Sequence, residues 1–126
     1  MAKTFKIALS PTFTATVNIP RVGADDIAVP FKFKTMDRKQ LANMFTEWNK
    51  AQTELIESSE NYDLADWTSK EIELQVNQIK DIVVGWGFED EFNDENIEAL
   101  VTTAISVTSV ITEVYSEAYT RAKKGN

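Results

Sequence analysis

The sequence contains no cysteine and no histidine. Without cysteine there can be no disulfide, no thiol nucleophile and no cysteine-ligated zinc. Without histidine, the commonest general base and metal ligand is missing. Catalysis would have to rest on carboxylates, lysines, tyrosines or hydroxyls alone. We therefore predict that the chain is not an enzyme and that it uses no cofactor.

Glycine and proline are scarce, with four and three residues in 126. Few glycines leave few places for a backbone to approach a ligand closely, and there is no phosphate loop or dinucleotide fingerprint. No apolar run approaches the length of a membrane span, and the apolar part of "MAKTFKIALSP" is too short for a signal peptide. We expect a soluble, intracellular protein with no membrane partner.

Acidic residues outnumber basic ones by 20 to 13, which gives a net charge of −7. Such a chain repels a phosphate backbone on average. The local exception is Lys32, Lys34, Arg38 and Lys39, which a solvated face explains. We predict no nucleic-acid partner.

A hydrophobic content of 43% over 126 residues indicates one domain with one core, spanning residues 1–126.

Two alternating segments predict an antiparallel β-hairpin over residues 12–34. "TFTATVNI" (12–19) and "DIAVPFKFK" (26–34) each place an apolar side chain at every second position. The segment between them contains Pro20 and Gly23, which favour a turn. Pro30 cannot donate a ladder hydrogen bond, so the second strand should be an edge strand or be bulged near that point.

Residues 35–122 predict about three helices. A capping box of Asp37 and Gln40, with Thr35 as the other candidate cap, starts a helix over about 37–57. "SSENYDLAD" (58–66) is polar enough for a loop. A second capping box, Thr68 and Glu71, precedes a single-face apolar stripe consisting of Ile72, Val76, Ile79, Val83 and Trp86. Gly87 is the expected left-handed cap of that helix.

The C-terminal third presents two conflicting signals. "LVTTAISVTSVITEVY" (100–115) is rich in β-branched residues, which favour strands. A longer stripe spaced three and four residues apart favours a helix over about 94–121; it consists of Ile97, Leu100, Ala104, Val107, Ile111, Val114 and Ala118. A break near Thr102 to Ser106 stays open, and residues 123–126 should form a flexible tail. The predicted fold class is α+β and mainly α-helical, with an N-terminal antiparallel β-hairpin followed by about three helices.

The segment "GWGFEDEFNDENIEAL" (85–100) combines aromatic and acidic side chains. We interpret Phe88 and Phe92 as anchors to the core, and Asn93 or Asp94 as the cap of the next helix. The acids do not fit an EF-hand loop in the registers that start at Asp90 or Glu91. No substrate site accompanies a carboxylate pair drawn from this segment, so we predict neither a metal site nor catalytic residues here.

Four segments in order resemble the tail assembly chaperones of long-tailed bacteriophages. They are "FKIALSPTFTATVNIP", "VPFKFKTMDRKQLANMF", the Gly-Trp and Glu-Phe-Asn stretch of residues 85–97, and "ITEVY" (111–115). Two features differ from that family: Ala104-Ile105-Ser106 stands where relatives often have a Tyr-Pro-Gly type break, and the segment around 52–70 is longer.

The resemblance implies a function. Members of the family bind the tape-measure protein, a long and aggregation-prone helical protein, and keep it soluble. They help recruit tail-tube protein and then leave the assembling tail. This chain would accordingly act in the host cell cytoplasm and be absent from the mature virion. Two other interpretations stay open: a small structural tail component retained in the virion, and a generic helical interaction module.

Five residues are candidates for partner binding. Trp67 follows Leu64 in a polar segment, whereas Trp48 and Trp86 lie on helix stripes and should belong to the core. Val101, Ile105, Val110 and Tyr115 widen the apolar arc of the last helix. They could serve partner binding or homo-oligomer formation, or the helix could simply be buried on two sides.

The C-terminal "YTRAKKGN" suggests a second product. Chaperones of this kind are often made in two lengths through a −1 ribosomal frameshift, and Ala122-Lys123-Lys124 can be encoded by GCA AAA AAG, which contains a slippery run. Lysines that complement a helix dipole explain the same residues. We expect a longer frameshift product that reaches the tail-tube protein.

Overall fold

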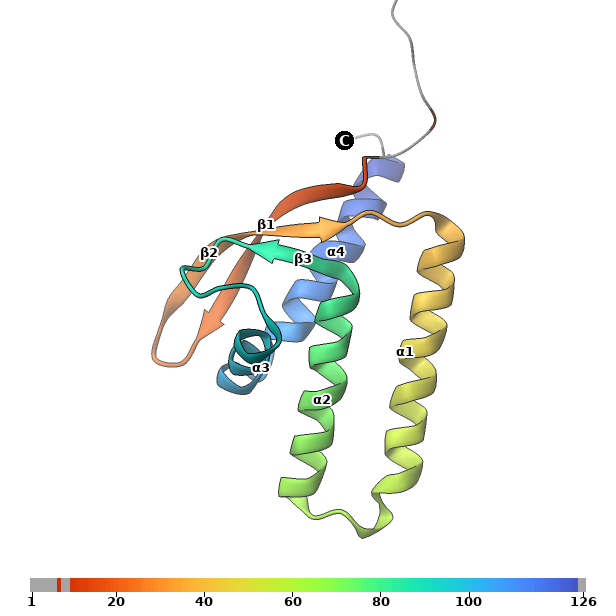
Figure 1. The fold of residues 1–126 in the computed structure, drawn as a ribbon, viewed down its shortest axis with the longest axis vertical. Coiled ribbons are helices and arrows are strands. Elements are labelled where there is room, and N and C mark those ends of the chain that lie inside the picture. The colour runs from red at the N-terminus through yellow and green to blue at the C-terminus, as the bar shows by residue number, and fades with distance from the viewer. Residues whose placement is uncertain (1–6, 8–9, 125–126) are drawn as a thin grey trace, which may run out of the picture.

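The structure is a computed structural model that describes residues 7 and 10–124, with side chains described up to residue 121 (Figure 1). Its elements are β1 (Thr12–Arg21), β2 (Ala24–Lys34), α1 (Arg38–Ser58), the 3-10 turn η1 (Ser59–Asn61), α2 (Leu64–Ile82), β3 (Val83–Trp86), α3 (Asp94–Thr103) and α4 (Val107–Lys124).

The predicted fold class is confirmed. The described residues form a third strand and four helices, where the sequence predicted a hairpin and about three helices. Residues 123 and 124, predicted as part of a flexible tail, belong to α4, which continues to Lys124; the rest of that prediction, residues 125–126, lies outside the described residues.

The hairpin of β1 and β2 is confirmed, with strands longer than the alternation indicated. They extend to Arg21 and from Ala24, so the connection shrinks to Val22 and Gly23. Gly23 has a φ of 71°, in the left-handed region that glycine enters without steric cost. The inward side chains form the sheet's part of the core; these are Val17, Ile19, Val29, Phe31 and Phe33.

Pro30 lies in the central strand, because the sheet order is β1-β2-β3, so the edge-strand alternative was wrong. The other alternative, a bulge near Pro30, agrees with the register irregularity between Lys32 and Phe33. The carbonyl of Pro30 accepts a hydrogen bond from the Gly87 N–H at 2.8 Å. The N–H and C=O of one strand residue point to the same side. The missing donor of Pro30 therefore faces the end of β3 and not the ladder with β1.

Helix α1 starts as the sequence predicted. Asp37 is the cap: its Oδ1 accepts from the Gln40 backbone N–H at 2.8 Å, and Gln40 Oε1 accepts from the Asp37 N–H at 3.0 Å. Leu41, Met44, Trp48 and Leu55 turn toward the rest of the molecule. Figure 1 shows α1 and α2 as an antiparallel pair that extends from the sheet, with η1 at the far end.

Helix α2 starts earlier than predicted, and the capping box at Thr68 and Glu71 was wrong. The cap is Asp63, whose Oδ1 accepts from the Asp66 N–H at 2.8 Å. The Thr68 hydroxyl donates back to the Leu64 carbonyl at 2.8 Å, as it does inside a helix. The helix starts at the earlier of the two possible caps, Asp63, and continues through Thr68.

The predicted end of α2 was also wrong, since the helix stops at Ile82 and the chain continues as β3. The β-branched Val83 and Val84 favour a strand, and an open edge of β2 is available for pairing. Gly87 has no positive φ, so it is not a left-handed cap. A Cβ at Gly87 would lie 2.6 Å from Pro30 Cγ. The glycine is therefore needed for close approach to Pro30.

The last third is broken into two helices, which settles a question that the sequence left open. Helix α3 ends at Thr103 and α4 begins at Val107, with a bend of 108° between them. Ala104 has extended backbone angles, and the Thr103 hydroxyl donates to the Ala99 carbonyl at 2.6 Å. The predicted apolar stripe survives the break, because Ile97, Ala104 and Val107 are all buried.

Helix α4 packs against β1 and closes the core, which contains a hydrogen-bonded chain of hydroxyls. The Met36 N–H donates to Tyr119 Oη at 2.9 Å, Tyr119 donates to Tyr115 Oη at 3.0 Å, and Tyr115 donates to the Lys34 carbonyl at 2.7 Å. Burial, followed by the hydrogen bond with Tyr119, raises the pKa of the Tyr115 hydroxyl well above its usual range. This chain ties α4 to the segment between β2 and α1.

Within residues 7 and 10–124, no single helix combines the length and apolar character needed to cross a membrane. Helices α3 and α4 reach that length and composition only when taken together across their 108° bend.

Candidate partner-binding surfaces

A groove of about 640 Å³ lies between α1 and α2. Its apolar lining comes from both helices and from the connection between them: Trp48, Ala51, Leu55, Tyr62 and Leu74. Trp48 Nε1 donates to Asp81 Oδ2 at 2.7 Å, which joins the two helices on one side of the groove. The two helices thus hold an elongated surface open between them.

The rim of this groove is acidic. Glu47, Glu54, Glu73 and Asp81 line it, with Lys70 as the one cation among the described lining residues. Lys70 Nζ lies 3.8 Å from Glu73 Oε2, and both side chains are mostly exposed, so this pair contributes little to stability. The groove therefore combines an apolar floor with a negative potential that suits a basic partner.

A smaller apolar groove of about 410 Å³ lies between the tip of the hairpin and the end of α3. Its walls include Ile19, Val22, Ile27, Leu100 and Ala104. Val22 is 92% exposed, and Ile105, which follows Ala104, is 94% exposed. Large apolar side chains this exposed pack little against the described part of the chain, which makes this corner a candidate contact surface.

A third groove, of about 880 Å³, lies where the start of β1, the start of α1 and the end of α4 meet. Phe13, Met36, Leu41 and Tyr119 make its floor apolar. Its wall also includes residues 7 and 10–12, beside the undescribed residues 8–9.

The acidic and aromatic segment after β3 is a folded connection. Trp86 packs edge-on against Phe88 and Phe92, with ring centroids 5.1 and 5.0 Å away, and Trp86 Nε1 donates to the Asp90 carbonyl at 2.8 Å. Phe88 and Phe92 are partly buried against the core, so the predicted anchoring role is confirmed. The acids Glu89, Asp90 and Glu91 point to solvent.

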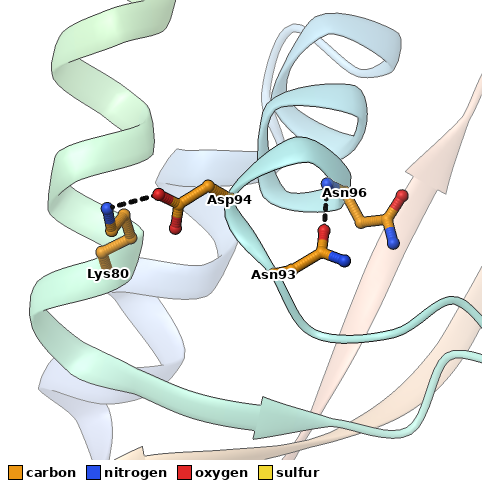
Figure 2. Close-up of polar contacts among 4 residues, drawn as sticks. All are labelled: Lys80, Asn93, Asp94 and Asn96. Atoms are coloured by element: carbon orange, nitrogen blue, oxygen red, sulfur yellow. Dashed lines mark hydrogen bonds and ion pairs between the residues drawn. The ribbon is translucent and has the colours of Figure 1, made fainter.

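Of the two caps proposed for α3, the structure selects Asn93. Its side-chain carbonyl accepts from the Asn96 N–H at 2.9 Å (Figure 2). Asp94 turns away from the helix start, and its Oδ2 lies 3.0 Å from Lys80 Nζ of α2 (Figure 2). Asn96 Nδ2 also donates to the Glu91 carbonyl at 2.7 Å. Three polar side chains thus fix the turn, with no chemistry required of them.

The described residues contain no group of three or more acidic side chains placed to hold a metal ion.

The structure separates the five predicted partner-binding residues. Val101 and Tyr115 are 3% and 1% exposed and belong to the core, and Val110 packs partly against it. Trp67 is half-buried in the first turns of α2 and not in a loop. Ile105 alone of the five is largely exposed. Partner binding by these residues stays a prediction, with Ile105 the best placed for it.

The acids of the groove rim were missed by the sequence analysis. Glu47 and Glu54 are seven residues apart in α1 and so lie on one helical face, a signal the sequence does contain. Glu73 joins them only because α2 packs antiparallel to α1. The pairing of helices, which the sequence pattern does not specify, was the missing information.

The family model for phage tail assembly chaperones matches residues 1–126. The chain belongs to the phage tail assembly chaperone family. The match covers all of the 126 residues, including the hairpin, the arm of α1 and α2, and the broken last third. Neither the curated proteins nor the solved structures include a significant match. A role in assembling phage tails therefore rests on the family, and the surfaces above are where contacts with other tail proteins can be sought.

Proposed function

We propose that this protein binds the tape-measure protein during tail assembly, keeps it soluble and helps recruit tail-tube protein, directly or through a longer frameshift product. The observation that carries this proposal is the family match over residues 1–126. The role is non-enzymatic. It is carried out in the host cell cytoplasm, and the protein leaves before the virion is complete.

The groove between α1 and α2 supports the proposal, because it suits a helical partner. Helix α1 has 21 residues, so the arm is roughly 30 Å long at about 1.5 Å per residue. An amphipathic helix can lay its apolar face on Trp48, Leu55 and Leu74 while basic side chains beside that face meet the acidic rim. Charge of this kind mainly sets association rate and partner choice.

Ile105 and the hairpin tip offer a second contact. Val22 lines a small apolar groove, Ile105 follows Ala104 of the same groove in the chain, and both Val22 and Ile105 are largely exposed. A second contact, distant in sequence from the first, would let one copy hold two parts of a long partner. The gain in effective concentration requires that both surfaces be engaged at once.

Coexpression with a tape-measure fragment tests the function. We expect the soluble fraction of the fragment to rise when this chain is present, and the two proteins to co-purify. The decisive variant reverses three exposed rim acids, E47K/E54K/E73K. The matched control, E89K/E91K/E98K, makes the same change of net charge at exposed acids outside the groove.

The two variants separate the function from the surface. If neither wild type nor control raises solubility, the chaperone role is wrong. If wild type, rim variant and control act equally, the role stands and the groove is the wrong surface.

Immunodetection in purified particles tests whether the protein leaves before the virion is complete: abundant protein in mature virions would favour a structural component. The nucleotide sequence tests the frameshift, since codons without the slippery run contradict it.

A further inference from the structure

The two edges of the sheet are built differently. Edge strand β3 has four residues, includes Gly85 and is followed by Gly87 against Pro30. Edge strand β1 has ten residues, and its first eight, 12–19, contain no charge, proline or glycine. Its register is regular until Ile19. Soluble proteins usually protect an exposed edge with lysine, proline, a bulge or short length. Over residues 12–19, β1 uses none of these devices.

The ladder shows which backbone groups of β1 point outward. Thr16 of β1 lies opposite Pro30 of β2, but the Pro30 carbonyl points the other way, toward Gly87. Thr16 and Pro30 therefore exchange no hydrogen bonds. Thr16 therefore points its N–H and C=O away from β2. Alternation along the strand gives the same direction to Thr12, Thr14 and Asn18. Among the described residues, no hydrogen bond outside the strand ladder reaches these groups. The strand order places β1 at one edge of the sheet, next to β2 (Figure 1).

We propose that this edge pairs with the β1 strand of a second copy of the chain, antiparallel and about a two-fold axis. The register that uses all four outward residues sets Thr14 opposite Thr16 and Thr12 opposite Asn18 of the other copy. Each such pair exchanges two hydrogen bonds, so the seam forms about eight.

The strand is complementary to itself in this register. On the inner face, Phe13 lies opposite Val17 of the other copy, and Ala15 lies opposite Ala15. Phe13 and Ala15 are only partly buried in one chain, so pairing covers apolar surface that is now open. Aromatic with β-branched pairs and threonine with threonine pairs are both favourable across strands.

Charge opposes a second copy less at this place than elsewhere on the molecule. The chain has a net charge of −7, so two copies repel each other over most approaches. Strand β1 carries no charge before Arg21, and the nearest charged side chains on the neighbouring strand are Lys32 and Lys34. The seam therefore avoids the acids on the arm and on the turn after β3.

The assembly closes at two copies, because an isologous pairing uses both β1 edges and leaves only the short β3 edges. A typical specific interface uses about 20–30 residues a side, many more than this strand provides. We therefore expect a dimer that dissociates on dilution.

Proline at position 16 is the first test. A proline is tolerated in an edge strand when its nitrogen faces outward, so Thr16→Pro should fold while losing one seam donor and blocking close approach. Light scattering over a range of concentrations should show a dimer for wild type and for the control Thr16→Val, and a monomer for Thr16→Pro. Circular dichroism checks that each variant is folded.

Charged side chains placed at the seam are the second test, which does not require the proline variant to fold. The variants T14K/T16K and T14E/T16E should each be monomeric, because like charges would face each other across the seam. Mixed together they should form a dimer that contains one of each. A monomeric wild type at all concentrations, a dimeric and folded Thr16→Pro, or a mixture that stays monomeric would each overturn the proposal.

Discussion

The sheet and α4 are packed more tightly than the arm formed by α1 and α2. Around the sheet, Phe31, Phe33 and Ile111 are 0% exposed; the ring of Phe33 stacks on Phe31 and contacts Tyr115 at a tilt. In α1 only Met44 and Leu55 are buried, each at 8% exposure, and a groove stays open beside the helix. The difference indicates that the sheet and α4 hold most of the stability, while the arm is free to vary its surface for a partner.

The largest expected effect tests this division directly. Phe33→Ala should lower the free energy of unfolding by about 3–5 kcal/mol, because it leaves a cavity among Phe13, Phe31 and Tyr115. Leu55→Ala in the arm should cost about 2 kcal/mol or less, since the open groove lets the site relax or hydrate. Urea unfolding measures both. Equal losses would show that the arm is as tightly packed as the sheet.

A second prediction concerns Gly87, which follows β3 and lies against Pro30 of β2. Gly87→Ala places a Cβ 2.6 Å from Pro30 Cγ and 2.7 Å from Pro30 Cδ. Overpacking against a rigid ring should cost about 1–3 kcal/mol. Gly85→Ala is the matched control, because its Cβ would meet Lys32 Cβ at an ordinary 3.7 Å. If thermal unfolding shifts equally for both variants, close approach to Pro30 is not the reason for the glycine.

The same segment shows where sequence patterns stop being informative. The stripe from Ile72 to Trp86 fits a helix, and the inward positions Ile79 and Val83 are buried as predicted. Yet the chain changes from helix to strand at Val83, because the edge of β2 offers backbone partners that a local pattern cannot reveal. Periodicity thus identified the buried residues better than the elements that carry them.

Partner surfaces were predicted less well than the core, for a related reason. Val101 and Tyr115 were candidates because they widen an apolar arc, but a helix packed on two sides buries that arc. A last helix buried on two sides was the other interpretation of the sequence, and the structure supports it for these two residues. Ile105 escapes burial only because α3 ends two residues before it.

A third prediction compares two tyrosines, one in each region. In Tyr115→Phe, the Lys34 carbonyl and the Tyr119 hydroxyl lose their partner, which should cost about 1–3 kcal/mol at neutral pH. Tyr62→Phe in the arm should cost little, since no side-chain hydrogen bond of Tyr62 occurs among the described residues.

The pH dependence of Tyr115→Phe has a definite sign. Burial and the bond with Tyr119 raise the pKa of the Tyr115 hydroxyl, so the folded chain keeps that proton above pH 10. The unfolded chain releases it at its ordinary pKa of about 10. Stability contributed by this group is complete below about pH 10 and is lost as the pH rises further. Tyr115→Phe should therefore lose stability less steeply than wild type above pH 10, as measured by unfolding at several alkaline pH values.

The smallest expected effect lies in the turn between the two regions, where Asn93 and Asp94 are neighbours with different tasks. Asn93→Ala removes the cap of α3 and should cost about 1 kcal/mol. Asp94→Ala removes an exposed ion pair with Lys80, in which the side chains of Asp94 and Lys80 are 76% and 42% exposed, and one of two acids in the first turn of α3, so it should cost under about 1 kcal/mol. Added salt should shrink the small effect of Asp94→Ala and leave that of Asn93→Ala unchanged, because ions screen an exposed pair far more than a local hydrogen bond. Thermal unfolding at low and high salt separates the two residues. A larger loss for Asp94→Ala would mean that the carboxylate, and not the amide, holds the start of α3.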